Sequence, residues 1–224
     1  MDPMTALLAL VRDPGGALDL PHYVQIAHAL ERARFDALLL SDTKLDPLVV
    51  LPALASVTDH IGLVADTSGV APYHLARKLA SLDHLSGGRA GWLIDTADGD
   101  LVTTEYVEVV RQLWDSFSDK AILRDKANAR YYDPDQLRTP HHRGEHFTVR
   151  GPLNISRPPQ GHPVIFQFGS ALLGDVFVDR ATDVAEFDTV AAVLGHTATL
   201  GDRGPYAGAT LRENLGLARP EVVR

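Results

Sequence analysis

Polar residues follow three apolar runs of the sequence, and these residues are the first candidates for chemistry. Asp42 ends the run that starts at Phe35, Thr67 and Ser68 follow the run 61–65, and Gly169-Ser170 follows the run 163–168. In parallel α/β folds the carboxyl ends of the strands form the active face, so Asp42 lies where a functional carboxylate is expected. Gly169-Ser170 is predicted to open a helix, where backbone N–H groups and a hydroxyl favour a phosphate.

Each of these residues also has a purely structural interpretation. Asp42 suits a cap of the loop that follows it, and Thr67-Ser68 suits a turn. Ser170 suits the N-cap of the predicted helix, because its hydroxyl accepts a free backbone N–H. The sequence leaves both interpretations open at every position.

A histidine cluster formed by His141, His142 and His146, with Glu145, suggests a metal site. Its spacing is not that of the zinc motif His-Glu-x-x-His, and no helix is predicted there to hold such a motif. The sequence has no cysteine, which excludes a disulfide framework, a thiolate nucleophile and a Cys metal site. No Ser-His-Asp arrangement, P-loop or GxGxxG motif is present. We predict no metal, and the catalytic residues stay unassigned.

An alternation of strands and helices has to position these residues. Apolar runs predict strands at 6–11, 35–42, 61–65, 90–94, 163–168 and 183–187. Helical periodicity predicts helices at 19–33, 47–57, 72–86, 105–117 and 169–181. The order of these elements favours a parallel sheet or barrel. The whole chain, 1–224, is predicted to form a single domain, with an insertion loop at about 120–160 and a tail over the surface at about 204–224.

The predicted helix 72–86 belongs to the most distinctive stretch of the chain. Pro72 suits its first turn, because a proline there loses only an N–H that would be unbonded anyway. Gly87-Gly88 ends it, since glycine adopts the left-handed conformation without a Cβ clash. Asp83 and His84 are interpreted as capping the end of this helix.

Composition excludes some classes of function. The formal net charge of −8 argues against a nucleic-acid partner. No apolar run reaches membrane-spanning length, and the apolar segment near the N-terminus is too short for a signal peptide. We therefore expect a soluble, cytoplasmic protein with no membrane partner.

The stretch PYHLARKLASLDHLSGGRAGW, from Pro72 to Trp92, resembles the signature of the bacterial luciferase-like flavin monooxygenases. The similar branch oxidises nitrilotriacetate, dibenzothiophene sulfone and long-chain alkanes. Further similar segments occur in the family's order, among them FDALLLSD, EYVEVVRQLWDSF, HRGEHFTVRGPLNISRPPQGHPVIFQFGS and TLRENLGLARP.

This resemblance implies an α/β fold, a TIM-like (β/α) barrel of the luciferase type. A complete barrel needs about 250 residues, and this chain of 224 also holds a long insertion. We therefore expect a reduced barrel that lacks about two βα units. The apolar strand edges left by the missing units are expected to be covered by the insertion loop or by a dimer partner.

The resemblance also implies a cofactor, reduced FMN delivered by a separate reductase. The residues of this chain that match the family's FMN contacts are Asp42, Thr67, Ser68, Gly169 and Ser170. Three departures weaken the match. Ala171 stands where the family has a second serine, Leu93 stands where it has an asparagine facing the flavin, and the loop 98–104 lacks its tyrosine and histidine.

The function implied is a flavin-dependent monooxygenase that uses reduced FMN and O₂ on a small organic substrate, with a flavin reductase as partner and a homodimer as the expected assembly. Two alternatives stay open. The barrel could have lost flavin and act as a small-molecule-binding or cofactor-independent biosynthetic protein. The chain could also be a partner subunit of an active paralogue.

Overall fold

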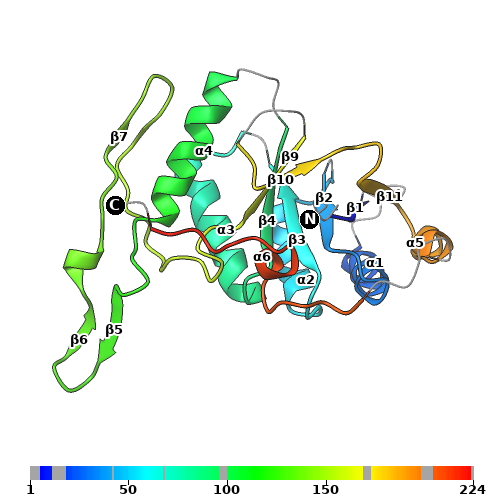
Figure 1. Ribbon diagram of the computed structural model, residues 1–224, viewed down its shortest axis with the longest axis horizontal. Coiled ribbons are helices and arrows are strands. Elements are labelled where there is room, and N and C mark those ends of the chain that lie inside the picture. The colour runs from blue at the N-terminus through cyan, green and yellow to red at the C-terminus, as the bar shows by residue number, and fades with distance from the viewer. Residues whose placement is uncertain are drawn as a thin grey trace.

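A curled sheet of seven parallel strands, in the order β10-β9-β4-β3-β2-β1-β11, forms the centre of the molecule (Figure 1). The computed structural model describes residues 6–11, 19–41, 43–67, 69–95, 100–168, 173–197 and 204–222. The sheet is a TIM-like half-barrel with helices outside it, so the predicted α/β fold class is confirmed. The strands are β1 Leu8–Val11, β2 Ala37–Leu40, β3 Gly62–Asp66, β4 Ala90–Asp95, β9 Val164–Phe168, β10 Val176–Val178 and β11 Val184–Phe187.

Five helices pack one against the next on the outer face of this sheet, in the order α5, α1, α2, α3, α4. Their bounds are α1 Leu20–Arg32, α2 Pro47–Ala55, α3 Pro72–Ser86, α4 Leu101–Trp114 and α5 Val190–Thr197. The left-handed residue Gly87 (φ 67°) ends α3, as its sequence predicts. No helix within the described ranges is both long and apolar enough to span a membrane.

Two apolar layers hold the sheet. Outward-facing side chains such as Leu38, Leu63 and Trp92 pack against the helices. Inward-facing side chains such as Leu39 and Leu93 form a second, smaller layer on the concave face. This alternation follows from the strand period of two, since consecutive side chains point to opposite faces.

The predicted helix 169–181 is wrong in the part that the structure describes. Val176–Val178 is strand β10, paired in parallel with β9, and the segment 179–183 links it to β11. Only the seven residues 169–175 separate β9 from β10, whereas a crossover that contains a helix needs a dozen or more. The run Val-Phe-Val also favours a strand, because β-branched and aromatic residues fit a pleated surface.

The C-terminal tail does not lie only over the surface. Its short helix α6, Leu211–Asn214, returns to the sheet (Figure 1), and Leu211 is fully buried in the inner apolar layer. Gly62 makes room for it, because a Cβ on Gly62 would come within 2.6 Å of a Leu211 methyl. The tail therefore closes one end of the half-barrel.

The insertion forms two small antiparallel hairpins rather than a cover for the sheet edges. The first pairs β5, Ile122–Asp125, with β6, Arg130–Tyr132, and a 3₁₀ turn, Pro134–Gln136, follows it. The second pairs β7, His142–Arg143, with β8, Thr148–Val149. Both lie on the α4 side of the molecule, away from β11 (Figure 1). The expectation that this loop covers both edges is therefore wrong.

Candidate functional site

The predicted site residues lie at the carboxyl ends of the strands, where the structure describes one of the five. Thr67 directly follows β3, and its hydroxyl is buried with no hydrogen-bond partner among the described residues. Asp42, Ser68, Gly169 and Ser170 lie outside the described residues. Leu93, the predicted departure from the family pattern, belongs to the inner apolar layer.

A pocket of about 240 Å³ opens inside the half-barrel at this end. On one side the Ser41 hydroxyl donates a hydrogen bond of 2.6 Å to the Asp66 carboxylate. These two residues follow β2 and end β3, so the parallel register of neighbouring strands brings them together. The pocket is lined by Leu10, Leu39, Ser41, Asp66, Leu93, Asp95, Phe168, Arg180, Val184 and Glu186.

The other side of this pocket holds a cation. The guanidinium of Arg180, from the link between β10 and β11, bonds the Asp95 carboxylate at 2.5 Å. It also lies 4.2 Å from the centre of the Phe168 ring, a cation–π contact. With Asp66 and Glu186, the lining has three carboxylates against one guanidinium. The described part of the mouth is therefore small, polar and acidic.

Asp95, Arg180 and Glu186 were not among the residues that the sequence singled out. Asp95 follows the apolar run 90–94 just as Asp42 ends its own run, so its position carried a usable signal. Arg180 carried none, because it falls within the helix wrongly predicted over 169–181.

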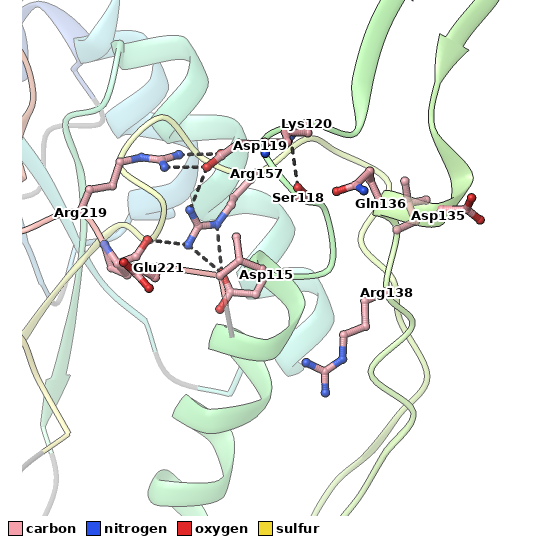
Figure 2. A pocket seen from close by; sticks show the side chains of 13 residues that line it. Asp115, Ser118, Asp119, Lys120, Asp135, Gln136, Arg138, Arg157, Arg219 and Glu221 are labelled. Atoms are coloured by element: carbon pink, nitrogen blue, oxygen red, sulfur yellow. Dashed lines mark hydrogen bonds and ion pairs between the residues drawn. The ribbon is translucent and has the colours of Figure 1, made fainter. Parts of the chain in front are cut away.

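The largest hollow of the molecule, about 1190 Å³, lies elsewhere, between the end of α4, the first hairpin and the C-terminal tail (Figure 2). Arg157 is buried there and pairs with Asp115 at 2.9 Å, while Arg219 pairs with Asp119 at 2.7 Å. Burial opposes ionisation of Asp115, but a hydrogen bond from His162 and the nearby Arg157 charge hold its pKa below the usual value. These groups already bind one another, so the hollow is a structural junction between segments.

The signature stretch serves the same structural purpose. The Asp83 carboxylate does not cap α3. It accepts the backbone N–H of Ala90 and both the backbone and side-chain N–H groups of Gln160. The His84 ring bonds the carbonyl of Ser156 at 3.1 Å. The predicted capping role of these side chains is wrong, because both reach across to the segment before β9.

The histidine cluster is organised by a carboxylate from α4. One oxygen of Glu105 bonds the His142 ring at 3.0 Å and accepts the Phe147 amide, and the other accepts the His146 amide. Burial acts to raise the pKa of Glu105, but these hydrogen bonds outweigh it and lower the pKa to about 2. Within the described ranges no group of three His, Asp or Glu side chains is placed to hold a metal.

This arrangement predicts that Glu105→Ala frees the β7–β8 hairpin from α4. The amides of His146 and Phe147 lose their acceptor, so their hydrogen exchange at neutral pH should accelerate about tenfold or more. In the wild type the folded pKa lies below the unfolded value of about 4.3. The attachment therefore stabilises the fold above about pH 4.3 and is lost as the pH falls toward 2. Unchanged exchange at both amides would contradict the assignment, and Glu108→Ala, on the exposed side of α4, is the control.

Comparisons with known proteins agree with this architecture. The family model "Luciferase-like monooxygenase" matches residues 5–186. The B component of the two-subunit pristinamycin IIA synthase of Streptomyces pristinaespiralis is 38% identical, with 97% of both chains covered. The A component of the same synthase is 37% identical over 75% of this chain but only 44% of its own length.

Among solved structures, a long-chain alkane monooxygenase superposes with a TM-score of 0.66 at 27% identity, covering 76% of this chain and 53% of that one. The chain thus spans nearly all of one relative and about half of the longer ones. The similarity to the alkane-oxidising branch is confirmed. By its sequence match and by its half-barrel, the chain belongs to the luciferase-like monooxygenase family.

Proposed function

We propose that this chain is the shorter subunit of a two-subunit, flavin-dependent monooxygenase. A longer luciferase-like chain would hold the reduced FMN and the small organic substrate, and a separate reductase would supply the reduced flavin. When bound in that longer chain, the flavin supplies the electron pair that activates O₂. The part of the present chain would be to pack against the longer one and exclude water from its site.

The small acidic pocket carries this proposal. FMN brings a three-ring isoalloxazine and a phosphate. Ligand pockets for molecules of that kind usually measure about 300–1,000 Å³. The described mouth measures about 240 Å³, and its three carboxylates would repel a phosphate. The described residues therefore do not fit the cofactor.

Two further observations support a partner. The relative that this chain matches from end to end is itself one component of a two-subunit synthase, and the other component is similar but more than twice as long as the matched part. In addition, no described helix follows β9 before β10. The helical layer is thus incomplete beside α4.

The test is co-expression with a longer luciferase-like chain from the same genome. We expect co-purification as a heterodimer by light scattering, and saturable FMN binding by the longer chain and the complex. The short chain alone should show no saturable binding up to millimolar FMN. Absence of any complex would contradict the proposal, and the same light-scattering measurement tests the homodimer predicted from the sequence.

A second candidate is a monooxygenase that binds FMN by itself, and the unpartnered hydroxyl of Thr67 favours it. Thr67→Val separates the two candidates. If the hydroxyl binds flavin, its loss should weaken FMN binding by about tenfold, or about 1.4 kcal/mol. If this chain binds no flavin, the substitution should leave stability unchanged or raise it by about 1 kcal/mol, since it removes an unsatisfied buried group. Thr148→Val, on exposed β8, is the matched control.

A further inference from the structure

A second cleft, of about 900 Å³, lies outside the half-barrel, between the start of α3 and the β7–β8 hairpin. Its size falls within the range of small-molecule sites. Three aromatic side chains line it, namely Tyr73, Tyr106 and Phe147. Tyr106 and Phe147 meet edge to face at 5.4 Å, so apolar ring surface is concentrated on one wall.

The charge of this cleft is opposite to that of the chain as a whole. Among its described lining residues are Arg150, His74 and His146, and none is Asp or Glu. Arg150 is exposed and makes no ion pair with any described residue, although the chain has 29 acidic residues. The N-terminus of α3 also borders the cleft. It has no side-chain cap, so the positive end of the helix dipole adds to the same potential.

The walls of the cleft are held in place by contacts that do not use its cations. Tyr106 donates its hydroxyl to the carbonyl of Val70 and packs at 5.7 Å against Trp92 of β4. Glu105 binds the amides of His146 and Phe147 from behind, which fixes the hairpin against α4. The site is therefore preorganised, and a ligand would not have to order it.

We propose that this cleft binds an organic anion with a planar, apolar body. The ring system would pack on Tyr73 and Phe147, and the carboxylate or phosphate would meet the guanidinium of Arg150. Arginine suits this role because it stays charged and presents paired N–H donors to such oxygens. The site is independent of the barrel mouth and of any second chain.

The test uses the chain alone and three probes: naphthoate, its neutral amide naphthamide, and acetate. We expect naphthoate to bind at least tenfold more tightly than either other probe, measured by calorimetry and by fluorescence quenching. Arg150→Gln should abolish the preference for naphthoate over naphthamide, and Tyr73→Ala should weaken both. Arg124→Gln, an exposed arginine on β5 outside the cleft, should change nothing.

Three outcomes would overturn the proposal. Naphthoate could fail to saturate, or Arg124→Gln could weaken binding as much as Arg150→Gln, which would indicate non-specific attraction. A hexaglutamate peptide could bind in preference to naphthoate, which would make the cleft a surface for an acidic protein segment. Each result is read on the short chain without flavin, so it is distinguishable from failure of the two-subunit function.

Discussion

Arg89→Ala is expected to lower the free energy of unfolding by at least about 4 kcal/mol. The Arg89 guanidinium is buried, and all its donors are used: Nε bonds the Ser86 carbonyl, Nη1 bonds the Thr58 hydroxyl and the Ile61 carbonyl, and Nη2 bonds the Ala55 and Thr58 carbonyls. Hydrogen bonds to charged groups contribute about 1.5–3 kcal/mol each, although not additively. Domains are stable by only about 5–15 kcal/mol, so this single change removes much of the total.

Urea unfolding measures the effect, and two companion variants interpret it. Arg89→Lys keeps the charge but not the planar fork, so it should recover only a small part of the loss. Arg77→Ala, on the exposed face of α3, should change the free energy of unfolding by less than about 0.5 kcal/mol. If Arg89→Ala fails to fold, the lysine variant still reports the effect. A loss below about 1 kcal/mol in either Arg89 variant would refute the role assigned to the fork.

The alternation of strands and helices was predictable because it is written in local patterns. Buried strands such as Ala37–Leu40 are uninterrupted apolar runs, and α3 carries both its starting proline and its terminal glycine. These signals depend on neighbours in the sequence, so no tertiary knowledge was needed. The parallel order then followed from the alternation itself.

The errors fall where tertiary contacts decide. Val176–Val178 could continue a helix by spacing alone, but pairing with β9 makes it a strand. Leu211 sits in a polar tail, and only the space left by Gly62 shows that it belongs to the inner layer. Arg180 and Asp95 meet across the mouth although 85 residues separate them. No local pattern announces such a pair.

Asp83→Ala is the second change expected to have a large effect, about 3 kcal/mol or more. It would leave three buried N–H groups without an acceptor, one on Ala90 and two on Gln160, and each such group costs about 1–3 kcal/mol. The loss should spread, because Gln160 also bonds the carbonyl of Ala90 and accepts the Arg212 amide. Asp83 thereby links α3 to the tail helix α6, and hydrogen exchange at Arg212 should accelerate with it.

A double-mutant cycle with Gln160→Ala tests whether this chain of contacts acts as a unit. If it does, the two substitutions together should cost about 1–3 kcal/mol less than the sum of their separate effects. Asp83→Asn adds a second readout. Burial raises the pKa of Asp83 against the opposing bonds from Gln160 and Ala90. The wild type should therefore gain stability as the pH falls through that raised pKa toward about 3.9, and Asp83→Asn should not. Additive losses with parallel pH profiles would mean that the family signature stabilises α3 alone and that the tail is held by other contacts.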